Sequence, residues 1–314
     1  MTFEEKTVRE DPFREVDESK MLSNPQNTIA VLQKYDIRLK KRFGQNFLID
    51  QHVLHKIIDG AQVSKEDVVL EIGPGIGTLT QYLSVAAKEV IAVEIDRNLI
   101  PILEDTLTGY ENVQVQNGDI QKLNLLEFVN QYNKGKPIKV VANLPYNVAT
   151  SIIMDLLEKK VPLESITVMV QKEVAKRMEA QPGTKDYGAL SVAVSYYAQP
   201  YIVANVPSNC FIPRPNVDSA VIRLTRYATP TVKTEDEHLL FQIVRAAFNQ
   251  RRKTLVNALH NFPELSVTKE QVQTALVQMD LPVTVRGEEL SLSQFAQLSD
   301  CLLEQKKTTR TCEV

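Results

Sequence analysis

The stretch Val68-Val69-Leu70-Glu71-Ile72-Gly73-Pro74-Gly75-Ile76-Gly77-Thr78 decides the fold class of this chain. Its apolar first half predicts a buried strand, and its glycines predict a turn that leads into a helix. The glycine spacing is G-x-G-x-G, and Thr78 stands where the third glycine of the dinucleotide pattern G-x-G-x-x-G would fall. Because that pattern places a pyrophosphate on a helix N-terminus, the difference favours an adenosyl ligand without phosphates.

Strands and helices alternate along the chain after this stretch. Further strands are predicted at 90–93, 113–115, 139–142 and 166–170, with helices between them. This alternation predicts a parallel, doubly wound α/β sheet. Residues 172–180 have a helical pattern, residues 190–198 fit a helix or a strand equally well, and 201–206 and 220–224 are strand-like.

The chain divides by pattern into three regions. Residues 1–27 contain seven acidic and few apolar side chains, which predicts a flexible acidic lead-in. Residues 28–228 form the expected Rossmann-like domain. Residues 232–314 show no strand signal and are expected to form a small all-helical domain. The capping-box helix starts in this last region are Thr234 with Glu237, Thr268 with Gln271, and Ser291 with Gln294.

Composition excludes several classes of protein. The 314 residues carry a net charge of -3, so bulk charge gives no support to a nucleic-acid partner. There is no long apolar run or signal segment, which makes a cytoplasmic protein without a membrane segment the expectation. The three cysteines and four histidines lack metal-ligand spacing, and no metal site is expected.

Polar groups follow three of the predicted strands at the points where they end. Glu94 closes the second strand and can accept both hydroxyls of a ribose, while Asp119 closes the third and can accept an adenine amino group. The strand 139–142 runs into Asn143-Leu144-Pro145-Tyr146. Pro145 cannot continue a central strand, so the chain leaves the sheet there. The Asn143 side chain and a carbonyl of Leu144 or Pro145 can accept both hydrogens of a planar amine.

Together these segments resemble the ribosomal RNA adenine dimethyltransferases, the S-adenosylmethionine-dependent family that includes bacterial KsgA. The resemblance runs in the family's order across roughly residues 30–225. The matching segments are GQNFL at 44–48, EIGPGIG at 71–77, EID at 94–96, NGDI at 117–120, NLPY at 143–146 and FIPRPNVDS at 211–219.

The resemblance implies a methyltransferase sheet that binds S-adenosylmethionine, and it implies a role for particular residues. The implied cofactor contacts come from Asn46, Leu48, Gly73, Glu94, Asp119 and Asn143. Tyr146 and Phe211 are implied to pack on the target adenine, beside the amine acceptors of Asn143, Leu144 and Pro145.

The resemblance also implies a reaction and a partner. The expected reaction is dimethylation of two adjacent adenosines near the 3′ end of small-subunit (16S) ribosomal RNA, by a monomer acting on a pre-ribosomal particle. RNA contacts are expected from local basic clusters on one face. These are Arg38 to Arg42; Lys172, Lys176 and Arg177; Arg214, Arg223 and Arg226; and Arg245 with Arg251, Arg252 and Lys253. Arg245 and Arg252 are expected to share a helix face.

Four other functions remain open at this point. One is methylation of large-subunit RNA by the antibiotic-resistance branch of the family, and another is methylation of DNA adenine, although Leu144 argues against the latter. A third is a ribosome-assembly factor whose binding role dominates. A nicotinamide-dependent oxidoreductase is the last, and the glycine spacing argues against it.

Overall fold

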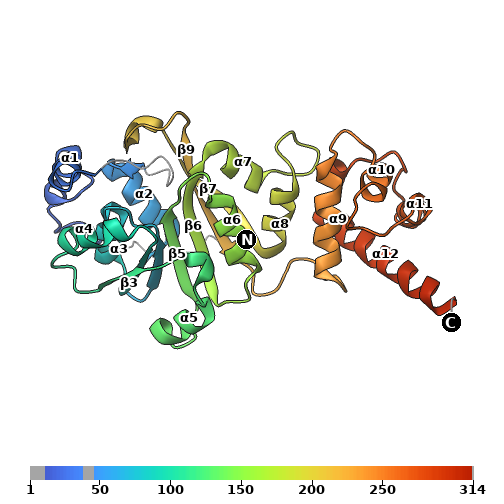
Figure 1. Cartoon of the computed structure of the whole chain (residues 1–314), viewed down its shortest axis with the longest axis horizontal. Helices are drawn as coiled ribbons and strands as arrows, with labels where there is room; N and C mark the ends of the chain where they lie inside the picture. Colours follow the sequence, from blue (N-terminus) through green and yellow to red (C-terminus); the bar gives the residue numbers. More distant parts are fainter. Residues whose placement is uncertain (1–10, 38–45, 313–314) are drawn as a thin grey trace, which may run out of the picture. The chain divides into compact units, whose positions relative to one another are not determined.

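A computed structural model describes residues 11–37 and 46–312 of the chain (Figure 1). Contacts divide the chain into two compact units, each made of two separate stretches. The first unit comprises Met1–Lys172 and Ile202–Arg223, and the second comprises Glu173–Tyr201 and Leu224–Val314. The second unit therefore includes helices that precede the expected helical region of 232–314.

The core of the first unit is a seven-stranded sheet with the strand order β4-β3-β2-β5-β6-β9-β7. Its strands are β2 Val68–Ile72, β3 Glu89–Glu94, β4 Val113–Asn117, β5 Ile138–Asn143, β6 Leu163–Gln171, β7 Ala198–Val206 and β9 Ser219–Arg226. β2 pairs in parallel with both β3 and β5, and β4 and β6 extend the sheet in parallel on either side. The doubly wound sheet predicted from the sequence is confirmed.

The strand order reverses between β2 and β5. From β2 the chain builds β3 and β4 on one side, and it then returns to build β5 and β6 on the other. In open α/β sheets, ligands bind at the carboxyl ends of the strands beside such a reversal, because the connecting loops diverge there. The pairing register places Ile72 opposite Val93 and Glu71 opposite Val141. The ends of β2, β3 and β5 are therefore neighbours.

Helices α2 (Gln51–Ala61) and α3 (Thr78–Ala86) cover one face of the sheet. Asp50 caps α2 as the sequence predicted, since its side chain accepts the backbone N–H of Val53 at 3.0 Å. Buried residues from both helices pack with Val69 and Val141 of the sheet in one apolar cluster. The remaining helices of the unit are α1 Pro25–Lys34, α4 Ile100–Thr106, α5 Leu125–Asn133 and α6 Ala149–Glu158.

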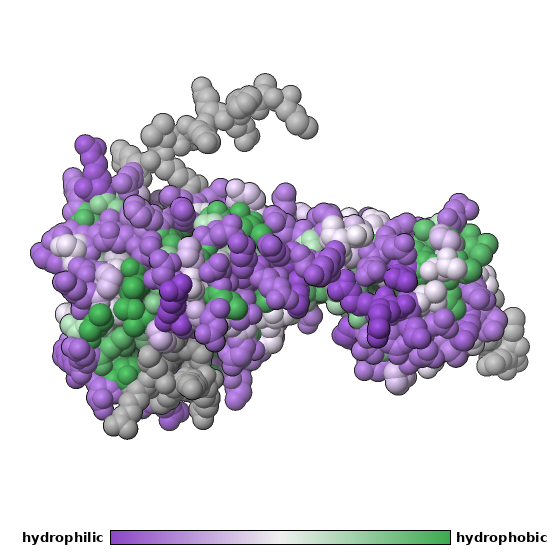
Figure 2. All heavy atoms as spheres, turned by 90° about the horizontal axis from the view of Figure 1, so that it is seen from above, coloured by the Kyte–Doolittle hydropathy of each residue, from purple (hydrophilic) through white to green (hydrophobic). Residues whose placement is uncertain are grey.

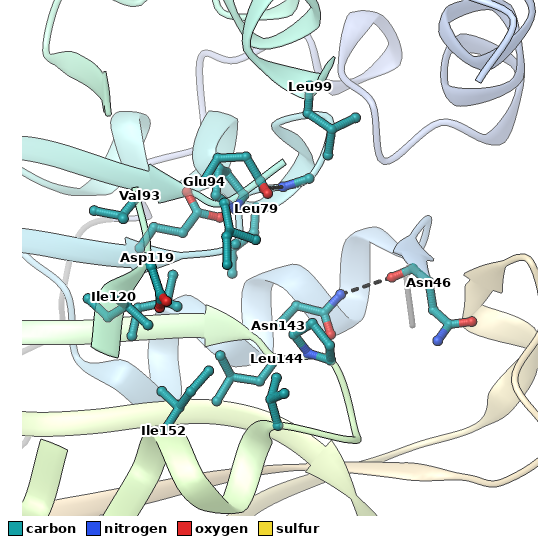
Figure 3. A pocket seen from close by; sticks show the side chains of 18 of the residues that line it. Asn46, Leu79, Val93, Glu94, Leu99, Asp119, Ile120, Asn143, Leu144 and Ile152 are labelled. Carbon is teal, nitrogen blue, oxygen red and sulfur yellow. Dashed lines mark hydrogen bonds between the residues drawn. The ribbon is translucent and has the colours of Figure 1, made fainter. Parts of the chain in front are cut away.

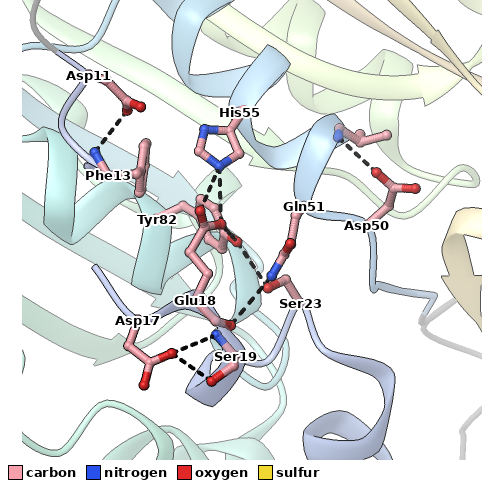
Figure 4. A network of polar contacts seen from close by, with 11 residues as sticks. Asp11, Phe13, Asp17, Glu18, Ser19, Ser23, Asp50, Gln51, His55 and Tyr82 are labelled. Carbon is pink, nitrogen blue, oxygen red and sulfur yellow. Dashed lines mark hydrogen bonds and ion pairs between the residues drawn. The ribbon is translucent and has the colours of Figure 1, made fainter. Parts of the chain in front are cut away.

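Residues 11–27 pack on this unit, which differs from the flexible lead-in expected at 1–27; residues 1–10 lie outside the described residues. Phe13 and Met21 are 6% and 3% exposed in the cluster beneath α2 and α3. The Glu18 carboxylate accepts a hydrogen bond from Tyr82 and lies 3.0 Å from His55 Nε2 (Figure 4). Part of the acidic charge that predicted a solvated segment is thus paired with the domain.

Helix α1 supports the loop that precedes α2. Val31 and Leu32 from α1 pack against a buried cluster that includes Phe47 and Leu99. Phe47 belongs to β1 (Phe47–Leu48), which pairs antiparallel with β8 (Phe211–Ile212). This arrangement fixes the short β1 segment beside the sheet.

The second unit contains the remaining helices. They are α7 Lys172–Glu179, α8 Ala189–Tyr197, α9 Glu237–Asn249, α10 Leu255–His260, α11 Lys269–Gln278 and α12 Leu292–Cys312. The ambiguous segment 190–198 is mostly the helix α8, and it passes directly into β7 at Ala198. None of the helices described is long and apolar enough to cross a membrane. The faces of the two units seen in Figure 2 are mostly hydrophilic, with apolar side chains in separate patches.

Two of the three predicted capping boxes are confirmed, at Thr268 with Gln271 and at Ser291 with Gln294. The third prediction, at Thr234, was wrong. Thr234 donates its hydroxyl to Asp300 at 2.9 Å, and Asp236 caps α9 in its place by accepting the N–H of Leu239. A carboxylate directly before the helix accepts this N–H without a hydroxyl further back in the chain.

The expected pairing of Arg245 and Arg252 on one helix face was also wrong, because α9 ends at Asn249. Arg251 lies beyond that end and donates hydrogen bonds to the carbonyls of Lys185 and Tyr187. The basic run from Arg38 to Arg42 lies outside the described residues. A single basic face stays a prediction.

Candidate active site

A cavity of about 330 Å³ lies at the carboxyl ends of β2, β3, β4 and β5 (Figure 3). Its volume is in the range of small-molecule sites. Nine of the ten residues predicted for the site line it. They are Asn46, Leu48, Gly73, Glu94, Asp119, Asn143, Leu144, Pro145 and Tyr146.

The glycine turn after β2 forms the floor of the cavity with its backbone. Gly73, Gly75 and Gly77 have φ angles of 67°, 65° and 96°, which side-chain-bearing residues rarely adopt. A Cβ atom on Gly75 would also lie 3.2 Å from the Phe47 ring. The turn therefore requires glycine for its shape, and it lets a ligand approach the main chain.

Glu94 ends β3 with its carboxylate fixed by the backbone. One oxygen accepts the N–H of Asp96 at 2.8 Å, and the other accepts the N–H of Gly75 at 3.3 Å. Glu94 is 4% exposed, and burial raises the pKa of its carboxyl. Each carboxylate oxygen keeps a further acceptor site, so the group can receive the two hydroxyls of a ribose.

Asp119 follows β4 and is less buried than Glu94. Its Oδ1 atom accepts the N–H of Gln121 at 3.1 Å, and its side chain is 27% exposed. Ile95 and Ile120, which directly follow Glu94 and Asp119 in the chain, also line the cavity. A planar adenine can lie between such apolar side chains while its amino group donates to Asp119.

Asn143 ends β5 with an orientation set by one hydrogen bond. Its Nδ2 atom donates to the carbonyl of Asn46 at 3.1 Å (Figure 3). The amide nitrogen is therefore engaged, and the Oδ1 atom is left as an acceptor on the cavity wall. The same bond connects the β5 end to the segment before β1.

The two carbonyls after Asn143 differ in their hydrogen bonding. The Pro145 carbonyl already accepts the N–H groups of Val148 and Ala149, at 3.2 and 3.1 Å, where α6 begins. The Leu144 carbonyl accepts no hydrogen bond from the described residues. Of the two carbonyls that the sequence left open, that of Leu144 is the one free to accept from a ligand.

The two aromatic residues predicted to contact a base lie in different surroundings. Tyr146 is partly exposed on the cavity wall, and its hydroxyl is 2.6 Å from Ser219 Oγ. Phe211 is 3% exposed and is absent from the cavity lining. It pairs with Leu48 across the β1–β8 ladder, in the apolar cluster beneath α2 and α3. The structure therefore places Tyr146 on the cavity wall, whereas Phe211 pairs with the site residue Leu48 but does not line the cavity.

Sequence reasoning missed Glu71, which also lines the cavity. It is 1% exposed, and burial raises the pKa of its carboxyl to about 8. An acid inside the apolar run Val68–Ile72 is a signal that could have found it, because buried carboxyls are rare without a partner.

The fold and the site define a class of protein, an enzyme that binds an adenosyl compound on a Rossmann-like sheet and presents acceptors to a planar amine. Within the part of the chain that the structure describes, no group of His, Cys, Asp or Glu side chains is arranged to hold a metal. A sequence model described as ribosomal RNA adenine dimethylase matches residues 37–302. The chain belongs to the ribosomal RNA adenine dimethylase family.

Two relatives illustrate the similarity in sequence. A protein of Lachnoclostridium phytofermentans, named ribosomal RNA small subunit methyltransferase A, is 60% identical over 287 residues. The match covers 91% of this chain and 99% of that protein. A protein of Lactococcus lactis with the same name is 48% identical over 288 residues, which cover 91% of this chain and 97% of that one.

Two solved structures illustrate the similarity in fold. A dimethyladenosine transferase from Plasmodium falciparum is 28% identical, covers 84% of this chain and 98% of its own, and superposes with a TM-score of 0.67. A 23S rRNA methyltransferase, ErmE, is 27% identical, covers 82% of this chain and 99% of its own, and has a TM-score of 0.62. The predicted fold class, the methyltransferase activity and the cofactor S-adenosylmethionine are confirmed.

Proposed function

We propose that this protein dimethylates the exocyclic amine of two adjacent adenosines near the 3′ end of small-subunit ribosomal RNA, during assembly of the subunit. The observation that carries the proposal is the pair of acceptors at the β5 end, Asn143 Oδ1 and the Leu144 carbonyl, on the wall of an adenosyl-binding cavity. The chain acts as a monomer on a pre-ribosomal particle in the cytoplasm.

Glu94 and Asp119 hold the adenosine half of S-adenosylmethionine in this proposal. Glu94 accepts the ribose hydroxyls, because its two oxygens are already oriented by backbone N–H groups. Asp119 accepts the adenine amino group. The Gly73 backbone, Asn46 and Leu48 border the other half of the cofactor. These assignments leave the end of the cavity at Asn143 for the target base.

The acceptors at the β5 end prepare the amine for attack. S-adenosylmethionine supplies a methyl group already activated by its positively charged sulfur. The amine of adenine is a poor nucleophile because its lone pair is delocalised into the ring. Asn143 Oδ1 and the Leu144 carbonyl each accept one of its hydrogens, which localises the pair on nitrogen and aligns it with the methyl group. The new N–CH3 bond forms as the S–CH3 bond breaks, and the amine then loses a proton to water.

Tyr146 offsets part of the cost of unstacking the adenosine from the RNA. Its ring is on the cavity wall, and its hydroxyl is fixed by Ser219. Stacking of a base on an aromatic ring contributes about 1–3 kcal/mol. Because Phe211 is buried beside Leu48, a second stacking contact from Phe211 requires the β1–β8 ladder to move.

Sequence similarity favours the small-subunit substrate over the large-subunit one. The relatives between 46% and 60% identical are named small subunit methyltransferases, whereas the 23S rRNA methyltransferase is 27% identical. The two alternative functions are methylation of large-subunit RNA and a role in assembly that depends on binding alone.

The test is methyl transfer from labelled S-adenosylmethionine to ribosomal subunits that lack adenine dimethylation. The proposal predicts two dimethyladenosines per small subunit, adjacent in the mapped sequence, and no label in large subunits. Label in large-subunit RNA would overturn the substrate, and absence of label from both subunits would favour the binding role.

A further inference from the structure

Glu71 is a buried acid in the wall of the cofactor cavity to which the proposed roles give no task. It precedes the last residue of β2 and lines the same cavity as Gly73 and Asn143. Its Oε2 atom is buried and accepts no hydrogen bond within the described residues. An ionised carboxylate at this position in the cofactor-free protein would be desolvated with no cation beside it among the described residues, which strongly favours the neutral acid.

Within residues 11–37 and 46–312, the surroundings of Glu71 supply no compensating cation. β3 contributes the Glu94 carboxylate, which has the same sign as an ionised Glu71. The buried Thr80 hydroxyl of α3 lies beside Glu71 and lowers the pKa of its carboxyl, but this effect is smaller than that of burial. The other ionisable groups on the neighbouring elements are engaged or exposed. Tyr82 of α3 and His55 of α2 contact Glu18, and Lys139 of β5 pairs with Asp67 and with Glu164 of β6. Glu89 of β3 bonds Gln114 at an exposed site, and His52, Lys56 and Asp59 of α2 are exposed.

We propose that Glu71 is a neutral acid in the cofactor-free protein and ionises when the positively charged half of S-adenosylmethionine enters the cavity. Because Glu94 and Asp119 bind the adenosine half of the cofactor, its other half, which carries the ammonium and sulfonium groups, lies toward the glycine turn that directly follows Glu71. The proton passes to solvent, and the carboxylate that remains pairs with the cofactor cation. This inference rests on the cofactor of the family and is independent of the RNA target proposed above.

The raised pKa of Glu71 sets the expected size of the coupling between proton release and cofactor binding. Burial raises the pKa of Glu71 from 4.5 to about 8, against a smaller lowering by the Thr80 hydroxyl and with a further small increase from Glu94. At pH 7 about 0.9 of the Glu71 side chains then carry a proton that binding must release. Below pH 8 the release makes binding tighter as the pH rises, by about ninefold between pH 6 and pH 7.

Calorimetric titration with S-adenosylmethionine, without RNA, measures both quantities. Titrations at pH 7 in buffers of different ionisation enthalpy give the number of protons released, and titrations at pH 6 and pH 7 give the change in Kd. Glu71→Gln has the shape of the neutral acid and no proton to lose. We expect about 0.9 proton from the wild type and none through this group in the variant, together with weaker binding by the variant at pH 7.

Two controls isolate Glu71. Glu94 is present in both proteins, so the protons that it exchanges independently of Glu71 cancel in the comparison. Thr80→Val removes the neighbouring hydroxyl and keeps the acid, so proton release should persist if that variant melts at the wild-type temperature. Equal proton release from wild type and Glu71→Gln, or an equal change in Kd between pH 6 and pH 7, would overturn the proposal. Release with S-adenosylhomocysteine as well would support it and assign the ammonium as the partner.

Discussion

Replacement of Glu94 by Gln separates cofactor binding from stability. The Glu94 carboxylate is buried and accepts the N–H groups of Asp96 and Gly75. An amide of the same shape has only one oxygen, so one of these N–H groups faces an NH2 group in the variant. A buried donor without an acceptor costs about 1–3 kcal/mol of folding free energy. The neutral amide also relieves the desolvation that raises the pKa of Glu94, which offsets part of this cost.

Cofactor affinity has no such offset. The carboxylate accepts two ribose hydroxyls in the proposed complex, and hydrogen bonds to charged groups contribute about 1.5–3 kcal/mol each. Loss of one such bond weakens binding of S-adenosylmethionine by about 10- to 150-fold. The expected result for Glu94→Gln is therefore a large increase in Kd with a small change in the free energy of unfolding.

Calorimetric titration and urea unfolding test this prediction together. Glu89→Gln is the matched control, because Glu89 begins the same strand and its side chain bonds only Gln114 among the described residues, at an exposed site. Both measurements should match the wild type in that control. A Kd for Glu94→Gln within twofold of the wild type would refute the ribose-binding role of Glu94.

Three further predictions follow from the structure. Gly77→Ala should destabilise the protein more than Gly73→Ala in urea unfolding, because a Cβ on Gly77 meets Leu107 at 3.1 Å while one on Gly73 meets nothing within 4 Å; equal losses would contradict the steric argument. Tyr82→Phe should lower the free energy of unfolding by about 1–3 kcal/mol, because it removes the hydroxyl that donates to Glu18. Tyr110→Phe should change stability little, and thermal melting of the two variants compares them. The free energy of unfolding of the cofactor-free protein should fall as the pH rises from about 5 to about 8, because Glu71 has a pKa of about 8 when folded and 4.5 when unfolded and so binds more protons in the folded state. Glu71→Gln should remove this pH dependence, and an unchanged dependence in the variant would contradict the role of Glu71.

The sheet could be predicted because its information is local. β3 and β5 are apolar runs that end at Glu94 and Asn143, and parallel strands in a doubly wound sheet end at the same edge. Glu94, Asp119 and Asn143 therefore lie around one cavity, as their positions after successive strands indicated.

The parts that escaped prediction depend on contacts between distant residues. Phe13 and Met21 belong to a stretch with few apolar residues, and their burial is decided by α2 and α3. The burial of Phe211 follows from its pairing with Leu48, which no periodicity reveals. At Thr234 the local signal was present, but the neighbouring Asp236 offered the better cap.

The central claim is that the end of β5 is where methyl transfer occurs, and Asn143→Ala tests it most directly. The variant lacks the amide that accepts from the target amine and that bonds the carbonyl of Asn46. Methyl transfer to small subunits lacking dimethyladenosine should be measured for both proteins, with subunit binding measured in parallel. The account predicts dimethyladenosine with the wild type, and subunit binding without methylation with the variant. Methylation by Asn143→Ala at the wild-type rate would contradict it.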